Sequence, residues 1–471
     1  MDDTKSNQSM KGIFIGDFVH CRSLDELEFL LDTAVCVDEE GWVVMVEREI
    51  SDQAKAKKIL LPRLSWKEDE VIFKVACKGQ FFFPGFIAPT DTHIHAPQYP
   101  NVGLFGKTTL LSWLENYTFP SEASLKDLDA ARRVYTRCIQ RSLSNGTTTA
   151  AYFATIDVSA TNLLADICFA HSQRAFIGRC CMDSAINPTT YRDASHETCL
   201  ADTRATIDYI ASIDPTNSLI MPIITPRFAP SCSTEVMNSL SSLQKATNLP
   251  IQTHISENRD EIALVKRLFP QHTTYAEIYD EHGLLCEKTI LAHAIHLTEA
   301  EADLIKIRNC KISHCPISNT ALCSGEARIR WLLNKGLEVG LGTDVSGGYS
   351  ISILEAAKHA LLVSRHVAMS GDEEAKLSVA EVLYLATRGG AKVVGLEKVG
   401  TFEIGMAWDS QLIGLATVGD DGAAPTLEDG KVDIFGWEGI EARVEKWLFN
   451  GDDRNTLAVW VQGRLVHSLE G

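Results

Sequence analysis

The stretch FIAPTDTHIH, residues 86–95, ends an apolar run on two histidines, His93 and His95. Side chains alternate along a strand, so a strand here puts the two imidazoles on the same face. Two neutral imidazoles that face the same way suit a zinc ion. In a chain with 14 histidines such a pair also arises by chance, since two core or surface histidines would give the same letters. The meaning of the pair therefore depends on the rest of the chain.

Further candidate residues stand where His95 stands, at the end of an apolar strand-like run and just before a loop or helix. The carboxyl ends of all strands of a β/α barrel meet at one mouth, and active-site residues gather there. Chance placement of one histidine at such a position is unremarkable, but a repeated placement predicts a shared site. These residues are His254 after 250–253, His293 after 289–292, His314 after 310–313 and Asp344 after 339–343.

Apolar strands alternate with amphipathic helices from residue 87 onward. Such alternation over roughly 300 residues predicts parallel β/α units, and the length suits a (β/α)8 barrel. We therefore predict an α/β fold in which residues 86–398 form a TIM-type barrel. Helices are predicted at 233–247, 260–268 and 378–396, and strands at 148–154, 175–178, 219–225, 251–254, 289–293, 311–314 and 337–341.

The two ends of the chain have β-type sequence. Each end alone is short for an independent sheet. We therefore predict that residues 1–85 and 399–471 pair into one small β-sandwich domain beside the barrel. Its strands are predicted at 12–19, 30–37, 41–46, 71–76, 81–83, 410–413, 457–461 and 465–466.

Composition limits the possible partners. The chain has 62 acidic and 44 basic residues, a formal net charge of -18. A surface this acidic repels phosphate backbones, which argues against nucleic acid and membranes as partners and favours a small neutral or cationic substrate. Residues 1–10 lack the apolar core of a secretory signal, and no stretch approaches the roughly 18 apolar residues of a membrane span. The 13 cysteines form no paired CxxC motif, so we expect reduced thiols in the cytoplasm.

Three runs are more distinctive than the histidines: WLENYTFP at 113–120, TPRF at 225–228 and HISENRDE at 254–261. With them the chain resembles the amidohydrolase superfamily, and within it the guanine deaminase family most closely. The resemblance extends from about residue 84 to residue 455. The other matching segments are 84–99, the two residues 111–112 that precede WLENYTFP, and 292–293, 314–316, 341–344, 347–350 and 451–455.

The resemblance implies one zinc ion per chain and hydrolysis of guanine to xanthine and ammonia. It also implies a homodimer, which no feature of the sequence itself indicates. The family's metal ligands fall on His93, His95, His254 and Asp344. Its catalytic groups fall on Glu257, which carries protons, on His293, which orients the water and stabilises charge, and on Asp344. Its substrate contacts fall on His95, Gln98, Arg227, Phe228, His254, Glu257 and Asp344.

The lysines favour a single metal. Two-metal members of the superfamily use a carbamylated lysine on a mid-barrel strand. Between His95 and His254 the lysines are Lys107, Lys126 and Lys245, and none lies in a strand-like run. Two departures from the family pattern are small: Ile317 replaces the usual Asn after the His-Cys-Pro motif, and residues 406–409 are a loose version of a motif that follows the barrel.

Several alternatives stay open at the level of sequence. The enzyme could act on another aminated or halogenated heterocycle, such as a triazine or a modified purine nucleoside. A barrel without activity could serve as a scaffold, although such proteins typically lose metal ligands. Arg227 could form a structural salt bridge, Phe228 could belong to the core, and His314 has no ligand role in the family's one-metal pattern.

Overall fold

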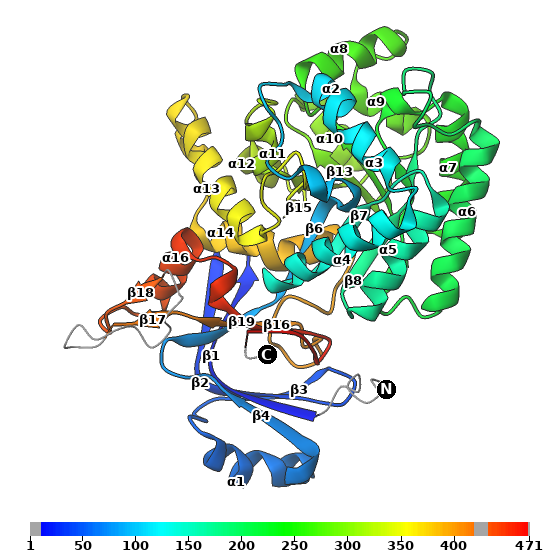
Figure 1. The fold of residues 1–471 in the computed structure, drawn as a ribbon. Helices are drawn as coiled ribbons and strands as arrows, with labels where there is room; N and C mark the ends of the chain where they lie inside the picture. The colour runs from blue at the N-terminus through cyan, green and yellow to red at the C-terminus, as the bar shows by residue number, and fades with distance from the viewer. Residues whose placement is uncertain (1–10, 419–431, 470–471) are drawn as a thin grey trace.

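The structure is a computed structural model that describes residues 11–418 and 432–469. The prediction about a secretory signal concerns residues 1–10 and lies outside the described residues. Two parts are visible in Figure 1: a large unit of strands surrounded by helices, and below it a sheet to which both ends of the chain contribute. No helix in residues 11–418 or 432–469 is long and apolar enough to cross a membrane.

The large unit contains eight parallel strands in two sheets. Backbone hydrogen bonds also connect the sheets, from Ile224 N to Pro250 O at 2.9 Å and from Asp344 N to His93 O at 2.8 Å. The first sheet has the order β10-β8-β7-β6, with β6 (Phe86–His95), β7 (Thr147–Phe153), β8 (Arg174–Gly178) and β10 (Ile220–Pro222). The second has the order β12-β13-β14-β15, with β12 (Ile251–Ile255), β13 (Thr289–His293), β14 (Lys311–His314) and β15 (Val339–Leu341). A two-stranded pair, β9 (Cys180–Cys181) and β11 (Thr225–Pro226), continues β8 and β10.

Helices cover the outside of these strands (Figure 1). Their starts follow the sequence, because Asp, Ser, Asn and Thr residues cap most of the longer helices. The predicted helix at 378–396 is interrupted by a π-helical turn at Leu385–Gly389. The helices are α2 (Leu110–Trp113), α3 (Phe119–Ser124), α4 (Leu128–Ser144), α5 (Val158–Ala170), α6 (His196–Ile213), α7 (Thr234–Thr247), α8 (Arg259–Leu268), α9 (Tyr275–Glu281), α10 (Glu299–Ile307), α11 (Pro316–Ala321), α12 (Ile329–Asn334), α13 (Ile353–Met369), α14 (Val379–Tyr384) and α15 (Gly390–Val393).

Strands from both ends of the chain form one mixed sheet of eight strands. Its order is β20-β19-β16-β5-β1-β2-β3, and β4 pairs with β1. The N-terminal β5 and the C-terminal β16 are antiparallel, with Phe82 opposite Leu412. Strands from the two ends of the chain therefore pair in one sheet. The β-sandwich predicted for these ends stays a prediction. The strands are β1 (Lys11–Ser23), β2 (Glu26–Val37), β3 (Val43–Glu47), β4 (Val71–Val75), β5 (Gln80–Pro84), β16 (Ser410–Gly414), β19 (Thr456–Val461) and β20 (Arg464–Ser468).

The two faces of this sheet bury different side chains. On β1, Ile13 and Ile15 pack in one cluster with residues of helix α1 (Gln53–Leu64). Phe14 and Phe18 point into an aromatic cluster on the other face, where the Phe14 ring stacks on Trp408 with centroids 4.1 Å apart. The alternation along β1 thus gives the sheet two separate cores. Near the C-terminus, β17 (Ala416–Thr417) pairs with β18 (Asp433–Ile434), and helix α16 (Ile440–Asn450) precedes β19.

All 13 cysteines lie among the described residues and are free thiols. Ten of them are buried. Burial raises the pKa of Cys21 to about 12, so this thiol stays protonated at neutral pH.

Candidate active site

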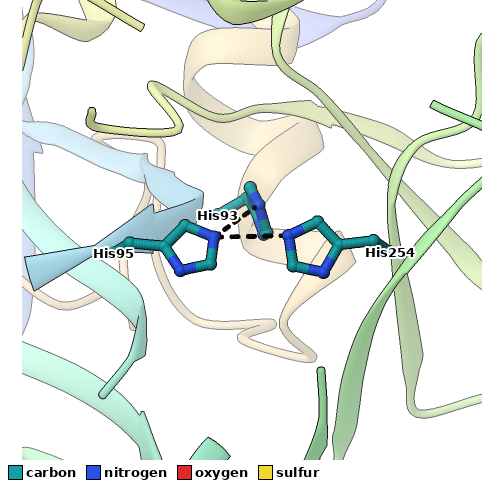
Figure 2. Close-up of side chains that lie close together, drawn as sticks. All are labelled: His93, His95 and His254. Atoms are coloured by element: carbon teal, nitrogen blue, oxygen red, sulfur yellow. Dashed lines mark hydrogen bonds between the residues drawn. The ribbon is translucent and has the colours of Figure 1, made fainter. Parts of the chain in front are cut away.

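Three imidazoles converge at the carboxyl ends of β6 and β12. The Nε2 atom of His95 lies 3.2 Å from Nε2 of His93 and 3.3 Å from Nε2 of His254 (Figure 2). The carboxylate of Asp344, just after β15, approaches the same point, with Oδ1 at 3.3 Å from His93 Nε2 and 3.5 Å from His95 Nε2. The structure thus brings together all four residues predicted as metal ligands.

This donor set fits a zinc ion. Tetrahedral ligands about 2.0–2.1 Å from zinc lie about 3.3–3.4 Å from one another, which matches the distances between these atoms. Burial lowers the pKa of each of the three histidines, which keeps the imidazoles neutral. Burial alone would raise the pKa of Asp344, but hydrogen bonding and charge from His93 outweigh it and lower the pKa to about 2. Neutral imidazoles and an ionised carboxylate are the forms that bind zinc.

Two further interactions hold the ligands in place. The Nδ1 atom of His254 lies 2.6 Å from the carbonyl oxygen of Arg227 and donates to it, which aims Nε2 at the cluster. Buried Asp91 accepts from the backbone N of Thr343 at 2.8 Å and from the Thr343 hydroxyl. This contact fixes the segment before Asp344 against β6. Asp344 itself has a positive φ of 47°, an unusual conformation that turns its side chain at the strand end.

Glu257 and His293 stand beside the metal cluster. The His293 Nε2 atom lies 3.6 Å from Glu257 Oε2 and 3.8 Å from Asp344 Oδ2. Burial raises the pKa of Glu257 to about 7, against the opposing charge of His293. Burial would lower the pKa of His293, but the charges of Glu257 and Asp344 raise it overall. A carboxyl group with a pKa near 7 can both take up and release a proton at neutral pH, as an acid–base catalyst must.

The start of helix α8 positions Glu257. Glu261 reaches back and accepts from the backbone N of Glu257 at 2.8 Å and of Asn258 at 3.1 Å, which forms a capping box. The hydroxyl of Ser324 donates to Glu257 Oε1 at 3.1 Å. These contacts hold the carboxyl group in place beside His293.

A cavity of about 410 Å³ opens between the cluster and helix α2. Gln98, Arg227 and Phe228, which were predicted to bind the purine, all line it, together with apolar side chains such as Trp113. The Phe228 side chain also belongs to a small apolar cluster with Trp113. Phe228 therefore packs in an apolar core and lines the cavity at the same time. The cavity also reaches His95, His254, Glu257, His293 and Asp344.

Sequence reasoning missed Glu122, Asn319 and Ser324. Glu122 accepts two hydrogen bonds from Arg227, at 2.6 and 3.0 Å, and Asn319 Oδ1 lies 2.9 Å from His293 Nδ1. The salt bridge considered for Arg227 therefore exists, and Arg227 lines the cavity as well. Glu122 lies two residues after the run WLENYTFP, which was the only signal for it.

His314 does not join the site. It is fully buried, does not line the cavity, and neither ring nitrogen has a hydrogen-bond partner among the described residues. Burial lowers its pKa to about 3. His314 is thus a neutral, buried histidine at the end of β14. The family pattern that the sequence resembles gives this position no ligand role either.

Comparison with known proteins gives a consistent result over nearly the whole chain. The model of the Amidohydrolase family matches residues 81–466. The chain is 46% identical over 464 residues to a probable guanine deaminase of Schizosaccharomyces pombe, covering 97% of this chain and 84% of that protein. It is 39% identical over 460 residues to a guanine deaminase of Homo sapiens, covering 96% of each.

Among solved structures, a crystal structure of guanine deaminase from C. acetobutylicum is similar, with a TM-score of 0.83 and 33% identity. The match covers 97% of this chain and 100% of that chain. That crystal structure has guanine bound in its active site.

Proposed function

The chain belongs to the amidohydrolase family and, within it, to the guanine deaminases, and we propose that it hydrolyses guanine to xanthine and ammonia with one zinc ion per chain. One observation carries this proposal: three of the four candidate metal ligands, His95, His254 and Asp344, line the same cavity as Glu257 and Arg227. A purine held by Arg227 can therefore present its amino-bearing carbon to the metal cluster.

His93, His95, His254 and Asp344 would hold the zinc ion. When bound, zinc lowers the pKa of a coordinated water toward neutrality and so supplies a nucleophile. The protein's own groups then manage the protons. Asp344 can accept a proton from the attacking water, and Glu257 delivers a proton to N3 of guanine as water adds to C2.

His293 and Glu257 complete the reaction. The charge at the attacked carbon is stabilised by His293, whose pKa is raised by the neighbouring carboxylates. A proton then goes to the departing amine, and ammonia leaves. Since Glu257 has a pKa near 7, it can serve as donor and acceptor within one turnover.

Recognition of guanine follows from the donors and acceptors in the cavity. Arg227 carries only donors, which suit the C6 carbonyl of guanine. Gln98 has a donor and an acceptor and can complete the same edge. Phe228 offers an aromatic face to the ring. A triazine would leave these groups without matched partners, and a nucleoside would add a bulky sugar to the ring, which favours guanine over those alternatives.

Further features of the sequence interpretation belong to this proposal. We propose that residues 86–398 form a closed (β/α)8 barrel, since backbone hydrogen bonds join the two parallel sheets at both of their outer strands. Residues 1–85 and 399–471 would form the small β-sandwich domain. A homodimer in the cytoplasm is expected by similarity to the family.

The direct test is a turnover assay with metal analysis. Purified protein should convert guanine to xanthine, identified by its ultraviolet spectrum and by chromatography, and should contain one zinc per chain. His254→Ala and Asp344→Ala should lose both zinc and activity. Protein that contains one zinc per chain but leaves guanine unchanged would refute the substrate, and two zincs per chain would refute the single-metal site.

A further inference from the structure

Glu122 lies behind the substrate cavity rather than in its lining. It is on helix α3, its side chain has 0% exposure, and it is among the residues that line a second, open pocket with Arg179 and Asp193. Both carboxylate oxygens are used: Oε2 accepts from Arg227 Nη1, and Oε1 accepts from Arg227 Nη2 and from Gln98 Nε2 at 2.8 Å. One buried carboxylate thus holds both polar groups proposed to recognise the purine.

The contact with Glu122 sets the orientation of the Gln98 amide. An ionised carboxylate only accepts hydrogen bonds, so the atom of Gln98 that faces it must be the NH2 group. The Gln98 Oε1 atom then accepts from the backbone N of Ser346 at 3.3 Å. The amide cannot turn over without losing both contacts, so the donor and acceptor that it offers to a ligand are fixed.

The same contact sets the charge that a ligand meets. Arg227 is 2% exposed, and the ring of Phe119 covers its guanidinium at 5.1 Å. The Glu122 carboxylate neutralises the guanidinium and accepts from two of its five N–H groups. Nη1 also contacts Met182 Sδ at 4.0 Å. The pair therefore offers hydrogen-bond donors without a net positive charge.

We infer that Glu122 is a positioning residue that fixes Arg227 and Gln98 and cancels the arginine charge, so that the pocket binds a neutral purine and does not retain an acidic product. This inference rests on the proposed function. Xanthine has an N–H between two carbonyls and ionises more readily than guanine. An uncompensated buried arginine would attract the xanthine anion strongly, because a charged pair interacts far more strongly in a low-dielectric site than in water.

The test uses Glu122→Gln in the zinc-loaded enzyme. The variant keeps the size of the side chain but leaves the Arg227 charge uncompensated and lets the new amide present either end to Gln98. KM for guanine should rise roughly 10- to 100-fold, as expected for the loss of charge-assisted hydrogen bonds, with a smaller effect on kcat. Inhibition by xanthine should become tighter as pH rises through the ionisation of xanthine.

Two matched variants separate this role from simple support of the fold. Glu122→Asp keeps the charge on a shorter side chain, so KM should rise less and the pH dependence of xanthine inhibition should stay as in the wild type. Glu381, on helix α14, pairs with the partly exposed Arg330 of helix α12 at 2.6 Å. Glu381→Gln removes that carboxylate away from the cavity and should leave KM and xanthine inhibition unchanged. Zinc content and melting temperature are measured for each protein.

The outcomes distinguish this inference from the proposed function. A wild type that does not convert guanine refutes the proposed function and the inference with it. An active wild type with an unchanged KM and unchanged xanthine inhibition in Glu122→Gln overturns the inference alone. If Glu122→Gln does not fold, the wild type and Glu122→Asp decide the question. Xanthine inhibition that becomes tighter as pH rises in either protein overturns the inference. Inhibition that does not become tighter supports it.

Discussion

A buried carboxyl group with a pKa of about 7 is poised between its two protonation states. Glu257→Gln preserves the size of the side chain and its ability to donate to or accept from neighbours, but an amide cannot carry a proton between water and substrate. Activity should therefore fall by a factor of roughly 10² to 10⁴. Zinc should remain bound, because Glu257 is not among the proposed ligands. Turnover close to that of the wild type would assign the proton transfer to another group.

The pH profile tests how Glu257 is tuned. The Ser324 hydroxyl donates to Glu257 Oε1, and a donor favours the ionised carboxylate and lowers its pKa. Ser324→Ala removes that donor, so the pKa should rise above about 7 and protonated Glu257 should persist to higher pH. If Glu257 protonates N3, the alkaline limb of kcat/KM should move to higher pH in the variant. A limb that stays in place or moves to lower pH would contradict this role.

At the scale of strands and helices, the candidate ligands could be predicted because each one lies at or near the carboxyl end of an apolar strand. His254 is the penultimate residue of β12 and His293 the last residue of β13, and parallel strands bring such ends together. Glu122 could not be predicted in this way, because a glutamate on a short helix reads as a solvated residue until Arg227 is seen beside it. Its role depends on a contact between segments 105 positions apart.

Local chemistry also explains where the predicted elements differ from the structure. The run 219–225 was predicted as one strand, but the structure has β10 and β11 separated by residues 223–224. Pro222 and Pro226 lack the N–H that a continuous ladder needs. The helix predicted at 378–396 retains its apolar face, while the π-helical turn at Leu385–Gly389 is a detail that hydrophobic spacing does not encode.

A buried ion pair fastens the small sheet to the parallel strands. Arg174 on β8 donates to Asp409, which precedes β16 and also accepts from the backbone N of Gln462 at 2.7 Å. Asp409→Asn leaves the Arg174 charge buried without its partner, which should cost roughly 3–5 kcal/mol in free energy of unfolding. Urea denaturation measures this loss. Asp280→Asn, which removes the partner of exposed Arg308, should have a much smaller effect, and equal losses in the two variants would argue against this account.

The proposed metal connects elements that are distant in the sequence. Its ligands come from β6, β12 and the segment after β15, so a bound ion should resist their separation. A ligand present at about a thousand times its Kd stabilises the folded state by about 4 kcal/mol. Removal of zinc by a chelator should therefore lower Tm, and readdition should restore it. In His254→Ala, which lacks one ligand, the chelator should change Tm little. A wild-type Tm that the chelator leaves unchanged would contradict a metal at these ligands.

At the scale of the whole molecule, the net charge of -18 and the cavity beside the metal cluster determine which purines reach that cluster. Guanine has a carbonyl at C6 and an amine at C2, whereas adenine has an amine at C6 and hydrogen at C2. The donors of Arg227 therefore suit guanine and oppose the adenine amine. A buried donor left facing another donor costs about 1–3 kcal/mol, so adenine should bind poorly, and it has no amine at the attacked carbon.

Size and charge exclude the larger relatives of guanine. A sugar at N9 would crowd a cavity lined by Trp113 and Phe228, so guanosine should be a poor substrate. Guanosine monophosphate should be poorer still, because the acidic protein repels its phosphate. The measurement compares guanine, adenine, guanosine, guanosine monophosphate and a triazine at one pH and ionic strength. Guanine should have the highest kcat/KM by a wide margin; a triazine or guanosine turned over faster would leave the zinc hydrolase intact but reject the purine orientation derived from Arg227 and Gln98.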